Sequence, residues 1–191
     1  MCARYSDIIN MSFGTVYSVT YEDLVEIGCP KPLKWVGSVK PYNYAEVSDA
    51  VANAITQGVV CIASAGNLSM NSGWFAPYPE LCDCSKIPFI AWPAAYSGVI
   101  AVSATGLNQS VEQFVDVWNY WSFVDVSAPG FDITTTDYYG GYTNVNGTSF
   151  SAPLTAALSG LLLSLNSNLT VQQVSDYITK STDKIDATRF P

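Results

Sequence analysis

A strand, a helix and a second strand follow one another early in the chain, and this order constrains the fold more than any other feature. Residues 7–14 are a short apolar run closed by Gly14, the pattern of a buried strand. Residues 44–57 carry apolar side chains at helical spacing, and residues 59–63 form a second buried strand. Strands joined through a helix pair in parallel and are covered by helices. The predicted fold class is α/β, a mainly parallel sheet between two helical layers (αβα).

Later segments add elements of the same kinds. Short strands are predicted at residues 99–104, 123–126, 132–136 and 142–144. A helix is predicted to begin near Ser149, and Thr170 with Gln173 forms a capping box that opens a last helix ending near Thr179. The helix from Ser149 carries leucines that include those at positions 154, 158, 161, 162 and 165.

Two irregular stretches, residues 15–43 and 68–91, are rich in proline and aromatic residues and are predicted to be long loops, the first with a short helix near residues 21–27. The chain has 191 residues, 49% of them hydrophobic, which suits one domain with a sizeable core.

Charge and hydropathy exclude several kinds of partner. Eight basic residues against 16 acidic ones, without blocks of like charge, provide no surface for nucleic acid or for anionic lipid. The most apolar long stretch, residues 152–165, is interrupted by Thr155, Ser159 and Gly160 and is predicted to be a buried helix, not a membrane span. The first residues show no secretory signal pattern. The five cysteines are scattered, and Cys82 and Cys84 are too close for a usual zinc pair.

The segment from Gly147 to Pro153 has the features of a nucleophile turn. Gly147 and Thr148 predict a tight turn that places Ser149 at a helix N-terminus, where unpaired N–H groups favour developing negative charge. Pro153 is tolerated in the first turn of a helix. Asn67 follows Gly66 just past a buried parallel strand, at the sheet edge where α/β folds build their sites.

The string Gly-Thr-Ser-Phe-Ser-Ala-Pro at residues 147–153 resembles the nucleophile motif of subtilisin-like serine peptidases. Further segments resemble that family in the same order, at residues 9–14, 63–67, 92–94 with 99–102, and 127–130. The resemblance implies that residues 1–191 are one partial catalytic domain, its C-terminal part, with loop insertions at 15–43 and 68–91. It also implies an endopeptidase with Ser149 as the nucleophile, and an oxyanion hole made by the Asn67 amide and the Ser149 N–H.

The resemblance further implies the sites of substrate contact. Ser12, Phe13 and Gly14 resemble the strand that pairs with an extended peptide, so the expected partner is a peptide or protein substrate. Ala63, Ser64, Ala65 and Gly66 resemble a wall of the pocket for the residue before the scissile bond, and their small size suggests a bulky apolar substrate residue.

The chain lacks the rest of this machinery. It contains no histidine, and neither the Asp-Thr/Ser-Gly nor the His-Gly-Thr string of the family. Because a serine hydroxyl needs an adjacent base, the chain alone is predicted to be inactive, with a missing N-terminal segment or a propeptide as a possible partner. Two alternatives remain open. One is a non-catalytic peptide-binding pseudopeptidase. The other is a sedolisin, for which Glu46 and Asp49 are the available acid pair, although that family has Asp at the position of Asn67.

No cofactor is expected to be required, and no side chain is assigned as a metal ligand. In some family members a weak structural calcium site uses backbone oxygens of the loop that matches residues 94–99 here. Asn108 and Asn168 begin acceptor sequons at plausible glycan positions. The compartment is not defined by the sequence, and the resemblance favours a secreted or endomembrane location.

Overall fold

The computed structural model describes residues 6–17, 45–67, 90–108, 111–114 and 123–184. Its main sheet contains β1 (Ile8–Met11), β3 (Val60–Ser64), β5 (Val99–Asn108), β6 (Val111–Phe114) and β7 (Val126–Pro129). The pairs β1–β3, β3–β5 and β5–β7 are parallel, and β6 folds back antiparallel on the end of β5. The predicted mainly parallel sheet is confirmed.

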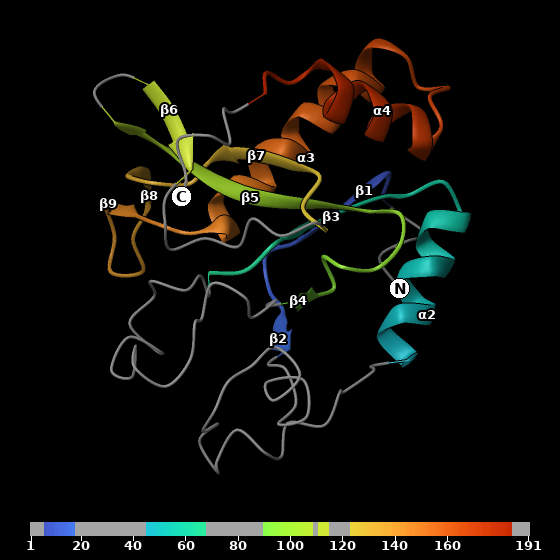
Figure 1. The fold of residues 1–191 in the computed structure, drawn as a ribbon, viewed down its shortest axis with the longest axis horizontal. Coiled ribbons are helices and arrows are strands. Elements are labelled where there is room, and N and C mark those ends of the chain that lie inside the picture. The colour runs from blue at the N-terminus through green and yellow to red at the C-terminus, as the bar shows by residue number, and fades with distance from the viewer. Residues whose placement is uncertain (1–5, 18–44, 68–89, 109–110, 115–122, 185–191) are drawn as a thin grey trace, which may run out of the picture.

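Helices cover both faces of this sheet. Along β3, Cys61 and Ala63 face a core cluster that includes α2 (Ala45–Thr56). Val60 and Ile62 face the opposite cluster, which contains side chains of α3 (Thr148–Leu165) and α4 (Val171–Ser181). Figure 1 shows α2 apart from α3 and α4, with the sheet between them. The three-layer αβα arrangement is therefore also confirmed.

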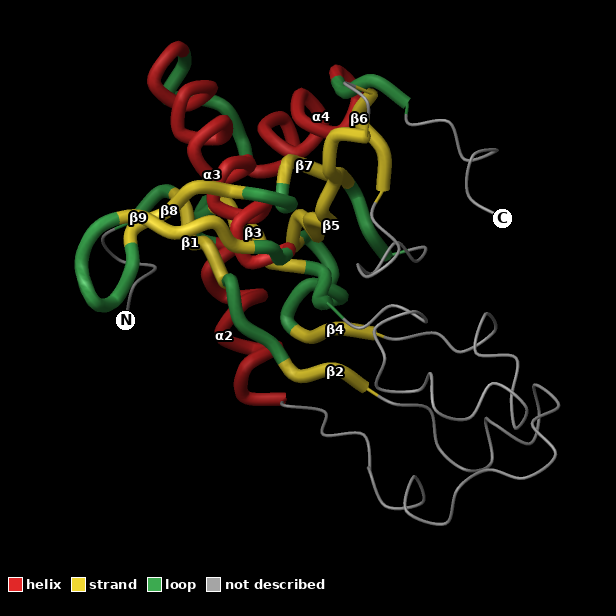
Figure 2. The backbone as a smooth tube through the Cα atoms, turned by 90° about the vertical axis from the view of Figure 1, so that its left-hand side faces the viewer, coloured by secondary structure: helices red, strands yellow, loops and turns green. Residues whose placement is uncertain are grey.

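Two short ribbons flank the main sheet. Just beyond β1, β2 (Thr15–Tyr17) pairs antiparallel with β4 (Ile90–Trp92). The predicted hairpin is present as β8 (Ile133–Thr136) and β9 (Tyr142–Val145), which leads directly into α3. Figure 2 shows both ribbons beside the sheet.

Local sequence signals gave most element positions correctly. The helix expected at residues 44–57 is α2, and the capping box of Thr170 and Gln173 is formed at the start of α4. The strand expected at 123–126 was misplaced, because β7 begins at Val126. Its partner β5 sets the register, pairing Val102 with Val126. The short helix expected near residues 21–27 lies outside the described residues.

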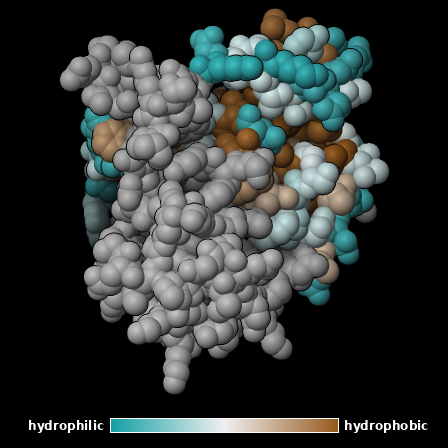
Figure 3. All heavy atoms as spheres, in the orientation of Figure 1, coloured by the Kyte–Doolittle hydropathy of each residue, from teal (hydrophilic) through white to brown (hydrophobic). Residues whose placement is uncertain are grey.

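The orientation of α3 differs from the expectation of a wholly buried helix. Its buried residues are small, namely Thr148, Ser151, Ala152, Thr155 and Ser159. Four of its leucines are exposed, from Leu158 at 44% to Leu165 at 85%. Within the part of the chain that the structure describes, α3 is the one helix long and apolar enough to cross a bilayer by length and composition. Core helices of soluble proteins meet the same criterion, and α3 packs against four strands of the sheet. Figure 3 shows apolar side chains reaching the surface between hydrophilic ones.

Candidate active site

Ser149 lies where the end of β1 meets the beginning of α3. Gly147 precedes the helix with φ 155°, a backbone conformation that side-chain-bearing residues rarely adopt, and its carbonyl accepts the Phe150 N–H at 3.0 Å. The Ser149 Oγ donates to the carbonyl oxygen of Ser12 at 3.3 Å. The predicted nucleophile and the predicted substrate strand are therefore neighbours, although 137 positions separate them in the sequence.

Asn67 is held by Thr148, the residue before the nucleophile. Its Oδ1 accepts hydrogen bonds from the Thr148 N–H at 3.0 Å and from the Thr148 Oγ1 at 2.8 Å. The Thr148 Oγ1 in turn accepts the Gly66 N–H at 3.2 Å. Two donors occupy the Asn67 carbonyl oxygen, so the amide Nδ2 is the end of this side chain left to donate elsewhere. The N–H of Ser149, early in α3, has no acceptor within the helix. These two N–H groups are of the kind that binds an oxyanion.

The turn before Ser149 is supported from the end of β7. Gly147 donates its N–H to the Gly130 carbonyl at 2.8 Å, and the Ser151 Oγ donates to the Pro129 carbonyl at 3.1 Å. A Cβ at Gly130 would overlap the Ser151 hydroxyl and would lie 2.6 Å from the Cβ of Ala104. Only glycine permits this close approach of β7 to the nucleophile turn.

Hydrogen bonds in the β8–β9 hairpin hold the segment that precedes the nucleophile turn. The Asn146 Oδ1 accepts the Asp132 N–H at 2.7 Å, and the Asp132 Oδ1 accepts from the Asn144 Nδ2 at 2.8 Å. The Thr134 hydroxyl donates to the Asn144 Oδ1 at 2.9 Å. Side chains of both strands thereby hold the chain that enters Gly147.

The segment that resembles a substrate strand is accessible. Ser12 is partly buried, Phe13 is 66% exposed and Gly14 is exposed. A Cβ at Gly14 would lie 2.5 Å from the Trp92 carbonyl oxygen, so this position requires glycine. The role of the segment in binding a peptide stays a prediction.

The predicted pocket wall differs in accessibility along its length. Ala63 and Ala65 are fully buried and Ser64 is 6% exposed, whereas Gly66 is partly exposed and Asn67 exposed. The side chains of the two alanines are therefore part of the packed interior, and contact with a substrate through this segment stays a prediction.

The acid pair considered for a sedolisin is not near Ser149. Glu46 and Asp49 are exposed on α2, which packs on the face of the sheet opposite to α3.

Within the described ranges there is no group of three or more His, Cys, Asp or Glu side chains that could hold a metal ion. Burial raises the pKa of the Cys61 thiol, which favours its neutral, unreactive form.

Two polar contributors were not recognised from the sequence. Thr148 had been interpreted only as a turn residue, yet its hydroxyl links Asn67 to Gly66. The side chain of Asn10 donates to the Ser12 Oγ at 3.0 Å and extends the network away from Ser149. The Thr148 contacts have no local sequence signal, because they join residues more than 80 positions apart, whereas Asn10 and Ser12 are only two positions apart.

The fold and this serine–asparagine arrangement resemble those of serine peptidases. A family model described as the subtilase family matches residues 4–190, and the chain belongs to that family. Relatives include Subtilisin-like protease 3 of Plasmodium falciparum (isolate 3D7), 34% identical over 146 residues that cover 73% of this chain and 18% of that protein. Subtilisin DY of Bacillus licheniformis is 31% identical over 141 residues, covering 74% of this chain and 46% of that protein.

Solved structures show the same fold. A cold adapted subtilisin-like serine proteinase matches with a TM-score of 0.63 at 24% identity, covering 98% of this chain and 54% of that chain. A second match, titled S41 Psychrophilic Protease, has a TM-score of 0.60 at 21% identity and covers 91% and 48%. The chain spans about half, or less, of the length of the relatives it matches.

Proposed function

We propose that this chain contributes the nucleophile and the oxyanion hole of a serine endopeptidase. The observation that carries the proposal is the fixed Asn67 side chain beside the nucleophile turn. Its Oδ1 accepts two hydrogen bonds from Thr148, at 3.0 and 2.8 Å. Fixed donors placed where charge develops stabilise a transition state without reorganisation.

In the proposed reaction, the Ser149 Oγ attacks the carbonyl carbon of a peptide bond. The carbonyl oxygen becomes negative and accepts hydrogen bonds from the Asn67 Nδ2 and the Ser149 N–H. Collapse of this intermediate breaks the C–N bond, releases the amine with a proton, and leaves an ester on Ser149. Water then hydrolyses the ester and regenerates the hydroxyl.

The proton of Ser149 needs a base, and the sequence has no histidine. We therefore expect the chain alone to be inactive and activity to require the part of a subtilase domain that carries the Asp and His. The expected substrate is an extended peptide lying along Ser12, Phe13 and Gly14, where an exposed backbone edge can pair with it. A propeptide would use the same surface.

The second candidate is a peptide-binding protein without catalysis. The lack of histidine favours it, and it shares the peptide surface with the first candidate. A fluorophosphonate probe separates the two when it is applied to this chain and to any longer form that contains it. Labelling of the longer form alone supports the peptidase, and labelling of neither supports the binding protein.

Two substitutions test the residue roles in an active longer form. Ser149→Ala is expected to abolish turnover, with Ser164→Ala, an exposed serine on the same helix, as the matched control. Asn67→Leu is expected to lower turnover with little change in substrate binding. Loss of one such donor costs about 10² to 10³ in turnover, a magnitude taken from a subtilisin. Full activity of Ser149→Ala would show that Ser149 is not the nucleophile.

The proposed chemistry requires no cofactor. A weakly bound structural calcium ion on backbone oxygens of residues 94–99 remains a proposal from the resemblance, and a rise in Tm with calcium but not with magnesium would support it.

We also propose a secreted or endomembrane location. One relative is described as a cell wall-associated protease of Bacillus subtilis (strain 168), and detection of the chain only in cytosolic fractions would contradict this location.

A further inference from the structure

The carbonyl group of Ser149 lacks its usual partner within α3. In an α-helix each carbonyl accepts the N–H of the residue four positions later. For Ser149 that residue is Pro153, which lies inside the helix and has no N–H. The helical turn that carries the nucleophile therefore has a carbonyl that receives no hydrogen bond from the N–H four positions later.

Ser12 supplies the missing donor. Its hydroxyl donates to the Ser149 carbonyl oxygen at 2.8 Å, in a partly buried position. The Asn10 Nδ2 donates to the Ser12 Oγ at 3.0 Å. Because the Asn10 amide occupies an acceptor site of this oxygen, the single hydroxyl hydrogen of Ser12 remains for the Ser149 carbonyl.

The contact between these two serines runs in both directions. The Ser12 hydroxyl donates to the Ser149 carbonyl, and the Ser149 hydroxyl donates to the Ser12 carbonyl at 3.3 Å. The pair joins the end of β1 to the first turn of α3. Because Pro153 has no N–H, the Ser149 carbonyl accepts a hydrogen bond from the end of β1 and not from its own helix.

We propose that Ser12 is a positioning residue whose side chain replaces the Pro153 N–H and holds the nucleophile's backbone against the substrate strand. The inference rests on the proposed function of Ser149 as nucleophile. A fixed Ser149 carbonyl fixes the peptide plane and the Cα of that residue, and with them the directions of its hydroxyl and N–H. Small displacements of reacting groups reduce rates strongly, by about 10²-fold for a shift of 1 Å.

The two carbonyls can be observed separately by NMR in the chain as it is. Serine is followed by phenylalanine three times, at Ser12-Phe13, Ser122-Phe123 and Ser149-Phe150. Labelling serine carbonyls with ¹³C and phenylalanine amides with ¹⁵N therefore gives three carbonyl-to-amide correlations. The Ser122 signal serves as an internal chemical-shift reference.

Ser12→Ala is expected to shift the ¹³C resonance of the Ser149 carbonyl upfield, because that carbonyl loses its hydrogen bond. The resonance of the Ser122 carbonyl is expected to stay unchanged. In the double variant Ser12→Ala with Pro153→Ala, the new N–H at position 153 can bond to the Ser149 carbonyl. The signal is then expected to return toward its value in Pro153→Ala alone. Ser12→Thr, which keeps the hydroxyl, is the matched control and should leave the signal unchanged.

A second variant covers the case in which Ser12→Ala does not fold. Ser12→Cys keeps the shape but donates weakly, and should give an intermediate shift. An unmoved Ser149 carbonyl in Ser12→Ala, or no return in the double variant, would overturn the proposal. Neither readout depends on activity.

Kinetics of a longer active form test the positioning role itself. Ser12→Ala should lower kcat about tenfold with little change in KM, and the double variant should recover part of the loss. Unchanged kcat overturns positioning even if the bond exists. If Ser149→Ala keeps its activity while the NMR shifts are as expected, the proposed function fails and the Ser12–Ser149 bond remains.

Discussion

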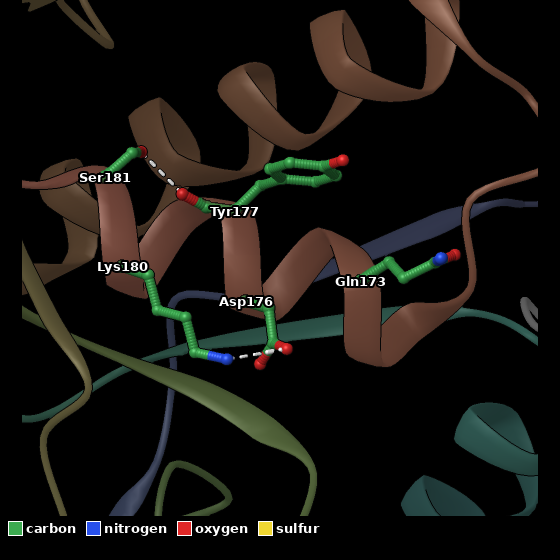
Figure 4. A pocket seen from close by; sticks show the side chains of 5 residues that line it. All are labelled: Gln173, Asp176, Tyr177, Lys180 and Ser181. Atoms are coloured by element: carbon green, nitrogen blue, oxygen red, sulfur yellow. Dashed lines mark hydrogen bonds and ion pairs between the residues drawn. The ribbon is translucent and has the colours of Figure 1, made fainter.

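The helices α3 and α4 lie on the same face of the sheet, yet they use opposite kinds of side chain to do so. In α4, Val174 and Ile178 are buried, and Gln173, Asp176, Tyr177, Lys180 and Ser181 line an open groove on its surface. Figure 4 shows these five side chains along one helix, with Lys180 bonded to Asp176. In α3, small residues are buried and leucines are exposed.

This difference indicates that the two helices pack at different distances from the sheet. Small residues such as Ala152 and Ser159, both fully buried, let the backbone of α3 approach the strands closely. This approach brings Thr148 within hydrogen-bond distance of Asn67. The outward side of α3 has exposed leucines and no charged residue. The amphipathic α4 instead has the polar outer face of a surface helix.

The largest effect is expected on the buried side of α4. Ile178→Ala removes a side chain that is 1% exposed and leaves a cavity beside Val126 and Val174 in the same core cluster. The free energy of unfolding should fall by about 2–5 kcal/mol, measured by urea denaturation. A loss below about 1 kcal/mol would mean that α4 is not firmly packed on the sheet.

A somewhat smaller loss is expected on the buried side of α3. Ala152→Leu adds three carbons where there is no free space and should lower the free energy of unfolding by about 1–3 kcal/mol. The matched control is Ala157→Leu, the same change at an exposed position of the same helix. Equal effects in urea denaturation of both variants would show that α3 has no preferred inner face.

The outer leucines should contribute little to stability. Leu161→Ala, at a residue that is 63% exposed, should change the free energy of unfolding by no more than about 0.5 kcal/mol. The comparison with Ile178→Ala is direct, because each removes part of a branched aliphatic side chain. If the same urea experiment gave equal losses, the leucine face of α3 would be covered in solution by some other surface.

The same contrast explains what could be predicted from the sequence. The start of α4 was found because the capping box of Thr170 and Gln173 is a local signal. The helix α3 was also found, but its buried face was not, since its leucines dominate the hydrophobic pattern while close packing selects small residues. Ser149 and Asn67 were predicted as site residues from motifs, whereas the contact of Ser12 with the Ser149 carbonyl joins residues 137 positions apart and has no local signal.

The smallest effect concerns the polar face of α4. The hydrogen bond from Lys180 lowers the pKa of Asp176 below its ordinary value of 3.8, with a further contribution from Gln172. A lowered folded-state pKa stabilises the fold above the unfolded pKa, and this contribution is lost as pH falls through the folded pKa. Because the pair is exposed, its effect on stability is small. Lys180→Gln should raise the pKa of Asp176 in a ¹³C NMR titration of its carboxyl carbon, and Gln172→Ala should raise it less. If neither variant moved the titration midpoint, this face would not be the ordered polar surface that distinguishes α4 from α3.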